Sequence, residues 1–151
     1  MAVEGNKRVW PLLGKLSEAD ELKAFNALCV AREKQADCMR RQQRLVTMRE
    51  DYEKRLSLAG DRILGARDIA IYRDFILHIE GLQKLQQQQI DALALVIAEA
   101  ECAYEKARLN TAKWSHLENR EAALLHRRRM VAEQKSIDES AAMRFAQRVG
   151  R

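Results

Sequence analysis

The fold depends on residues 58–67, LAGDRILGAR, where two glycines interrupt a sequence that otherwise favours helix. Gly60 and Gly65 can adopt a positive φ and end a helix, and long stretches with few helix breakers flank them on both sides. The stretch therefore predicts a hairpin tip at 58–67. It joins a helix over about 11–57 to a second helix over about 68–148.

Before the tip, residues spaced alternately by four and three form one stripe, which is the spacing of a coiled-coil seam. Most of its members are apolar: Ala24, Leu28, Ala31, Gln35, Cys38, Gln42, Leu45, Arg49, Tyr52, Leu56 and Ala59. The start of this helix has two readings. Trp10-Pro11 suits a first turn, whereas Ser17 and Asp20 resemble a capping pair and would place a break near Gly14.

The same spacing continues after the tip. Its members are Tyr72, Ile76, Ile79, Gln83, Gln86, Ile90, Leu93, Ile97, Ala100, Tyr104, Ala107, Thr111 and Trp114. Beyond Trp114 the apolar set shifts to Leu117, Leu124 and Val131, which predicts overwinding or the end of the paired region. We therefore predict an all-α fold. The whole chain, 1–151, is expected to form one domain, a long antiparallel two-helix coiled-coil hairpin with the second helix overhanging the first.

Folding back at the tip brings particular residues of the two helices to the same level. Trp10 is expected within half a heptad of Trp114. Four glutamines are expected close together in the seam, with Gln42 nearest Gln83 and the other two about a layer away: Gln35, Gln42, Gln83 and Gln86. Polar seam residues lower stability but penalise shifted registers. The glutamines therefore have two readings, a register role and a deliberately loosened zone.

The composition is typical of long helices, with 47% hydrophobic, 5% aromatic and 32% charged residues and one proline. Three cysteines without a C-x-x-C pair, Cys29, Cys38 and Cys102, favour a reducing compartment. No apolar run is long enough for a signal peptide or a membrane span. The formal charge of +5 lies mostly in 101–151, which holds eleven Lys or Arg and seven Asp or Glu.

Catalytic chemistry is not indicated by any residue pattern. His78, His116 and His126 lack partners at metal-ligand spacing, and neither a phosphate-binding glycine loop nor a nucleophile elbow occurs. A two-helix hairpin also offers no concave cleft in which two carboxylates could acquire different pKa values. We predict no enzyme activity, no cofactor and no metal, and expect a protein that engages other proteins.

Two stretches are candidate binding surfaces. Phe75, Ile79, Leu82 and Gln86 share one helix face, and the first and third flank the seam, where a two-stranded coil leaves them partly exposed. This arrangement indicates either a partner-binding patch or a surface that the tip loop covers. The second stretch is His126-Arg127-Arg128-Arg129, which suits nucleic acid, an acidic membrane surface or an acidic protein cavity. Because no aromatic residue interleaves to stack bases, a solvated, partly protein-binding segment is favoured over one that reads nucleic acid.

The order of features along the chain resembles the FliJ family of flagellar export proteins, which is related to YscO-type injectisome stalks. The features that carry the resemblance are Tyr52 before the tip, Tyr72-x-x-Phe75-Ile76, Trp114, Glu133-Gln134-Lys135-x-x-Asp138-Glu139 and Phe145-Ala146-Gln147-Arg148. The resemblance implies a non-enzymatic stalk of the flagellar type III protein export apparatus. Such a stalk couples the hexameric export ATPase to the membrane export gate, an FlhA-like protein, and handles export chaperones.

The resemblance also implies a location and site residues. The protein would be cytoplasmic and peripherally associated with the inner-membrane export apparatus. Phe75, Ile79, Leu82 and Gln86 would bind the gate, although Leu82 and Gln86 replace a small residue and a histidine of the family pattern. Its helical ends would sit in the ATPase ring, with Arg127, Arg128 and Arg129 as contacts. The alternatives are an injectisome stalk, a basic coiled coil that binds nucleic acid or an anionic surface, and a homodimeric scaffold.

Overall fold

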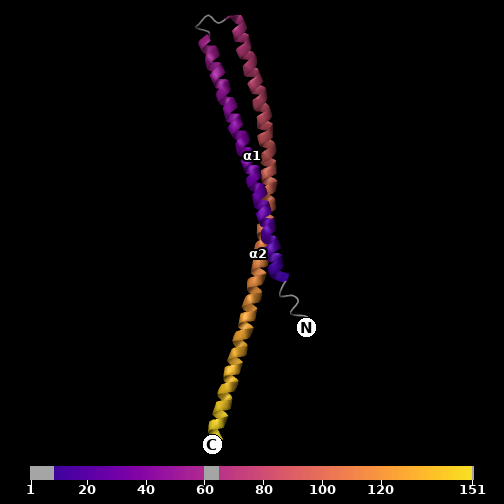
Figure 1. Cartoon of the computed structure of the whole chain (residues 1–151), viewed down its shortest axis with the longest axis vertical. Helices are drawn as coiled ribbons and strands as arrows, with labels where there is room; N and C mark the ends of the chain where they lie inside the picture. Colours follow the sequence, from indigo (N-terminus) through magenta and orange to yellow (C-terminus); the bar gives the residue numbers. More distant parts are fainter. Residues whose placement is uncertain (1–8, 60–64, 151) are drawn as a thin grey trace. The chain divides into compact units, whose positions relative to one another are not determined.

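The computed structural model describes residues 9–59 and 65–150, which form two α-helices and no strand (Figure 1). Helix α1 spans Val9–Ala59 and helix α2 spans Ala66–Val149. The two long helices pack against each other, which confirms the predicted all-α hairpin. The core of the predicted tip, 60–64, lies outside the described residues.

Local sequence explains how each helix begins. Pro11 lies in the first turn of α1, where its missing N–H is one of the donors that no helical carbonyl would satisfy. At the start of α2 the Gly65 carbonyl accepts from the backbone N–H of Asp68 at 2.9 Å and of Ile69 at 3.4 Å. The Asp68 carboxylate in this first turn also interacts favourably with the positive end of the helix dipole.

The chain forms two compact units, and each contains part of both helices. Leu22–Lys106 make up the first, which we call the hairpin unit. Met1–Glu21 together with Ala107–Arg151 make up the second, which we call the terminal unit. In the hairpin unit α1 and α2 run side by side in opposite directions, because Phe25 contacts Tyr104 and Tyr52 contacts Tyr72 (Figure 1).

The seam of the hairpin unit confirms the predicted spacing. Its fully buried members are Leu28, Ala31, Ile79 and Ile90, and every other predicted seam residue from Ala24 to Leu56 and from Tyr72 to Tyr104 is half-buried. The side chain of Ala59 lies outside the described residues. A two-stranded coil buries only one stripe on each helix, so this thin row of contacts is the whole core of the unit.

The terminal unit joins the beginning of α1 to α2 through an aromatic pair and a polar cluster. The rings of Trp10 and Trp114 lie 5.5 Å apart, which confirms the predicted pairing. Ser17 is 3% exposed, and its Oγ accepts from the Asn110 side-chain amide at 3.0 Å. The Thr111 hydroxyl lies 3.3 Å from Ser17 Oγ and 3.1 Å from the Ala107 carbonyl. Ser17 can therefore donate to Thr111 while Thr111 donates to that carbonyl.

The structure corrects the predicted break near Gly14. Helix α1 runs through Gly14 without interruption. Ser17, read as a helix cap, instead lies in the seam and bonds to α2. Glycine in a helix costs about 1 kcal/mol relative to alanine. The contacts of Trp10 and Ser17 on either side of it offset that cost.

Beyond Trp114 the structure agrees with the predicted shift at Leu117 and with the predicted end of the paired region, but Leu124 and Val131 are exposed. Leu117, Glu121 and Leu125 are half-buried, whereas Leu124 is 47% exposed and Val131 is 69% exposed. Glu121 and Leu125 keep the original spacing, because the aliphatic stem of a glutamate can occupy a seam position while its carboxylate reaches water. From 126 to 150 every residue is exposed. This exposed part of α2, which we call the C-terminal segment, is the predicted overhang.

Gly81→Ala is expected to raise the free energy of unfolding by about 0.5–1 kcal/mol. Gly81 lies inside α2 with no positive φ, and a Cβ added there meets no atom within 4 Å. Thermal or urea unfolding followed by circular dichroism measures the change. Ala94→Gly, at an exposed position of the same helix, should lower stability by a similar amount. A destabilised Gly81→Ala variant would contradict the expectation.

Candidate binding surfaces

An aromatic cluster lies in the hairpin unit where α1 ends and α2 begins. The Tyr52 ring lies 4.9 Å from that of Phe75 and 5.9 Å from that of Tyr72, measured between centroids. The Arg55 guanidinium lies 5.7 Å from the Tyr52 ring centre, within the range of a cation–π interaction. The cluster borders a hollow of about 310 Å³ lined by Tyr52, Arg55, Asp68, Ile71, Tyr72 and Phe75. Both helices therefore contribute to this surface.

The four residues expected to bind the export gate do not share one surface. Phe75 is 45% exposed and Leu82 is 39% exposed, but Ile79 is only 1% exposed. Gln86 is half-buried, and its side-chain nitrogen is buried without a hydrogen-bond partner. Ile79 and Gln86 belong to the seam that faces α1. Only Phe75 and Leu82 are therefore available to a partner while the two helices stay paired.

The exposed apolar row beside the seam has two further members. Ile71 is 55% exposed and Leu85 is 58% exposed, and each lies one position before a seam residue, as Phe75 and Leu82 do. We call these four residues the apolar stripe: Ile71, Phe75, Leu82 and Leu85. The sequence could have indicated Ile71. It lies four residues before Phe75, which lies seven residues before Leu82, and these intervals are the seam spacing displaced by one residue. His78 is the exposed polar member of the same row.

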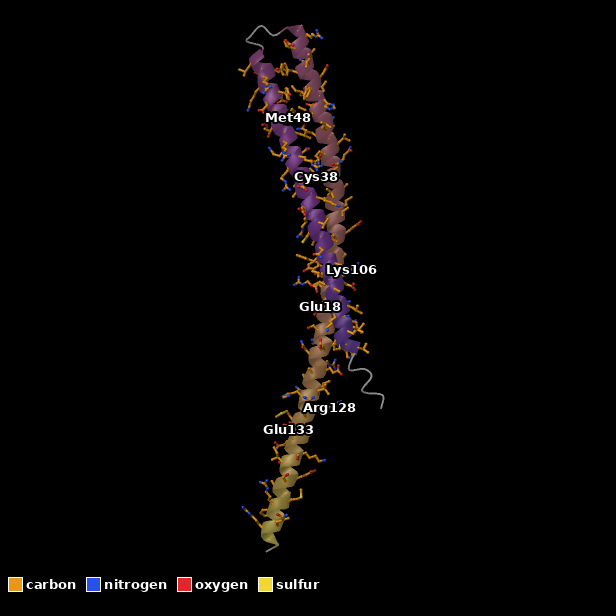
Figure 2. All side chains as sticks on the ribbon, in the orientation of Figure 1. Glu18, Cys38, Met48, Lys106, Arg128 and Glu133 are labelled. Atoms are coloured by element: carbon orange, nitrogen blue, oxygen red, sulfur yellow. The ribbon has the colours of Figure 1, made fainter. Side chains whose placement is uncertain are left out.

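Among the described residues, the contacts of the C-terminal segment are within its own helix. Gln134 donates to Asp138 at 2.9 Å, and Lys135 pairs with Glu139 at 4.0 Å. Figure 2 shows the side chains of Arg128 and Glu133 projecting from α2 with no second helix alongside. Large apolar side chains in this segment are 53–71% exposed: Met130, Val131, Ile137, Met143, Phe145 and Val149. Such a helix is unusually apolar for one that has no packing partner.

Arg127, Arg128 and Arg129 all lie on the C-terminal segment and are exposed. Three consecutive residues of a helix point about 100° apart, so the guanidinium groups surround the helix and do not form a stripe. This arrangement suits a surrounding acidic surface better than a flat one. One groove of the segment is a hollow of about 540 Å³ lined by Val131, Gln134, Lys135, Asp138, Glu139 and Ala142.

A polar layer interrupts the seam of the hairpin unit. Arg49 Nη1 donates to Gln83 Oε1 at 3.4 Å, and Arg49 Nε lies 3.3 Å from Glu53 Oε1. Gln42 and Gln83 line one hollow of about 300 Å³ together with Arg49, which confirms that these two glutamines lie close together. Two buried polar atoms of the layer, Gln42 Oε1 and Gln86 Nε2, have no hydrogen-bond partner, and Arg49 Nε makes only its ion pair with Glu53. Unpaired polar atoms of this kind lower the stability of a seam.

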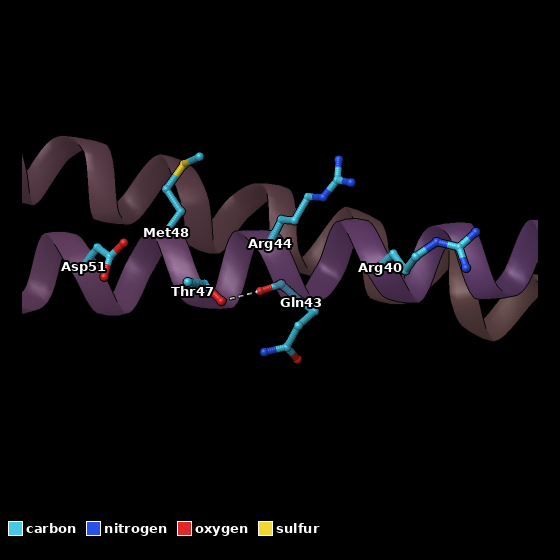
Figure 3. A pocket seen from close by; sticks show the side chains of 6 residues that line it. All are labelled: Arg40, Gln43, Arg44, Thr47, Met48 and Asp51. Carbon is cyan, nitrogen blue, oxygen red and sulfur yellow. Dashed lines mark hydrogen bonds between the residues drawn. The ribbon is translucent and has the colours of Figure 1, made fainter.

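A shallow hollow of about 460 Å³ lies on the face of α1 that points away from the seam. Figure 3 shows its lining, with Arg40 and Arg44 one helical turn apart and Met48 and Asp51 beyond them. Thr47 bonds to the Gln43 carbonyl at 3.1 Å, as is common for threonine within a helix. Guanidinium groups and a thioether therefore lie on one open surface.

The described residues contain none of the usual constellations for chemistry. Within residues 9–59 and 65–150 there is no group of three His, Cys, Asp or Glu side chains that could hold a metal ion. Cys29, Cys38 and Cys102 are free thiols. Neither described helix has a stretch apolar enough to cross a membrane. The described surface has open grooves and exposed rows of side chains on its helices, to which a ligand could bind.

Comparison with known proteins gives one match. The family described as Flagellar FliJ protein matches residues 11–150, nearly the whole chain. No curated protein and no solved structure matches. The match includes both helices, the apolar stripe and the C-terminal segment.

Proposed function

Because the chain belongs to the FliJ family of flagellar proteins, we propose that it is the stalk that couples the hexameric export ATPase to the membrane export gate. The family places the chain in the flagellar export apparatus as a non-enzymatic component. In the proposal the C-terminal segment enters the ATPase ring and the apolar stripe binds the cytosolic part of an FlhA-like gate. The protein is then cytoplasmic and reaches the inner membrane through the gate complex. Export chaperones are further partners of its helical surface.

The observation that carries the proposal is the C-terminal segment. It is helical to Val149, and every one of its residues is exposed, including Phe145 at 71%. A single helix without tertiary contacts is only marginally stable in water unless another surface covers it. A ring with a polar, acidic interior and apolar contacts at its mouth would cover the three arginines and the apolar side chains together. The flagellar description of the family favours this system over the injectisome alternative.

The apolar stripe supports the second contact. It leaves Phe75 exposed beside Tyr52 and the hollow of about 310 Å³, and Leu82 exposed two turns farther along α2, so a partner could bury both side chains without separating the helices. Ile79 and Gln86, in contrast, contribute by holding α2 in register against α1. For the gate contact we therefore propose Phe75 and Leu82 as the direct contacts and Ile79 and Gln86 as positioning residues.

Phe75→Ala combined with Leu82→Ala is expected to weaken binding to the gate's cytosolic domain by roughly 10- to 100-fold, if each partly exposed anchor contributes about 0.7–1.4 kcal/mol. Titration of the purified gate domain against the full-length chain measures the change. Leu95→Ala combined with Leu109→Ala removes two leucines that are 70% and 67% exposed elsewhere on α2, and is the matched control. Equal binding by the Phe75/Leu82 variant and the native chain, with helicity unchanged, would contradict the gate contact.

A further inference from the structure

A band of positive charge crosses the hairpin unit at the level of the polar layer. On α1 there is no acidic residue between Asp37 and Glu50, and on α2 there is none between Glu80 and Asp91. Five cationic side chains lie within these limits, and we call them the basic band: Arg40, Arg41, Arg44, Arg49 and Lys84. The bond from Arg49 to Gln83 and the hollow that Arg49 shares with Lys84 show that the two stretches face each other.

The charges of the basic band are poorly compensated within the chain. Arg40 pairs with Asp37 and Arg49 with Glu53, both on the same helix. In the part of the chain that the structure describes, Arg41, Arg44 and Lys84 have no ion-pair partner. Arg40 and Arg44 are also one turn apart, and like charges at that spacing destabilise a helix. The sequence thus concentrates repulsion here, as it also does at Arg127, Arg128 and Arg129.

The surface of the band is shaped for contact. Two hollows lie at its level on different faces: one of about 460 Å³ on the outer face of α1, which Asp51 also lines, and one of about 300 Å³ beside the seam, which Glu80 also lines. Met39 is 49% exposed and Met48, drawn in Figure 3, is 44% exposed, which gives the band an adaptable apolar border. Guanidinium groups bind carboxylates through paired hydrogen bonds, and methionine accommodates varied apolar side chains.

We propose that the basic band binds an acidic amphipathic helix of a partner protein. The band covers about 12 residues of α1, or ~18 Å of helix, which matches three to four turns of a partner helix. Acidic residues border it on both sides, at Asp37 and Glu50, and would repel an anionic surface that extends farther. No aromatic side chain lies within the band to stack bases. A short acidic protein segment therefore fits better than nucleic acid or a membrane.

The test uses the full-length chain and a fluorescent helical peptide of about 12 to 14 residues with Glu on one face and Leu on the other. Arg41→Glu combined with Arg44→Glu is expected to weaken peptide binding at least about tenfold, measured by fluorescence anisotropy. Lys23→Glu combined with Lys106→Glu changes the net charge equally at two exposed positions elsewhere in the hairpin unit and should leave binding within about twofold. A peptide with Lys replacing Glu should bind the Arg41/Arg44 variant better than it binds the native chain.

Three results would overturn the proposal. The first is an equal loss of peptide binding in both charge-reversal variants, which would indicate attraction to net charge alone. The second is tighter binding of a duplex DNA of about 20 base pairs, with loss in the Arg41/Arg44 variant. The third is a doubled mass in sedimentation that the same variant abolishes, which would indicate pairing with a second copy. If Arg41→Glu/Arg44→Glu loses helicity, the Arg→Gln pair at the same positions takes its place. The gate and ATPase assays are independent of this outcome.

Discussion

A chain that ends after Leu125 is expected to lose its ability to stimulate the export ATPase. The truncation removes the C-terminal segment, including Arg127, Arg128 and Arg129, and leaves Trp10 paired with Trp114. Because every removed residue from 126 to 150 is exposed, the loss takes away no tertiary contact of the described chain. Stimulation should therefore fall by roughly tenfold or more at equal concentration, with unfolding of the hairpin unit unchanged. A coupled ATPase assay with the purified ring enzyme measures it.

Two controls separate the basic triplet from the apolar residues of the segment. Arg127→Glu with Arg129→Glu in the full-length chain tests charge. Phe145→Ala with Val149→Ala tests the side chains that are 71% and 69% exposed at the end of the helix. Unchanged stimulation by the truncated chain would exclude the proposed ring contact. If the Phe75/Leu82 variant kept its gate binding, the gate contact would be wrong but the proposed ATPase-ring contact would not be affected.

Ile79→Ala is expected to lower the free energy of unfolding by about 2–5 kcal/mol, the usual range for deleting a buried isoleucine side chain. Ile79 is 1% exposed and lies in a seam only one residue wide on each helix, so no second layer of side chains can fill the space. Urea unfolding of the full-length chain measures the change. Ile71→Ala, at a position 55% exposed on the same helix, should stay within about 0.5 kcal/mol of the native chain.

Ile79→Ala also tests how this residue contributes to binding of the gate. If it acts by holding α2 in place, gate binding should weaken in parallel with stability and recover under conditions that stabilise the hairpin. An Ile79→Ala variant with native stability and lost gate binding would show instead that Ile79 contacts the gate directly. Such a result would require the two helices to separate when the partner binds.

The seam was predictable from sequence because burial in a two-stranded coil follows one spacing. Once Gly60 and Gly65 are taken as the turn, the number of residues on either side brings Trp10 to the level of Trp114, and the structure places their rings in contact. Glu121 was not predictable in this way. Its burial does not follow from residue type or spacing, because Glu118 is exposed although it is also a glutamate on the original register.

The binding surfaces were harder to predict for a related reason. A stripe of four residues with helical spacing, such as Phe75 to Gln86, can cross from the outside of a coil into its seam. Ile79 and Gln86 also belong to the predicted seam. In the structure Ile79 is buried and Gln86 is half-buried in that seam, so they do not form an outer surface with Phe75 and Leu82. The basic band could not be predicted from the order of residues, because its members belong to two distant stretches of the chain. Their charges combine only after the hairpin brings Lys84 beside Arg49.

The three consecutive arginines of the C-terminal segment have a practical consequence. Trypsin cleaves after arginine but needs an unfolded segment, and a helix without tertiary contacts opens locally at low free-energy cost. Arg127, Arg128 and Arg129 are therefore expected to be among the earliest cleavage sites in the free protein. A partner that encloses the segment would slow cleavage there, so the rate at which the fragment appears reports occupancy of this helix end without any label.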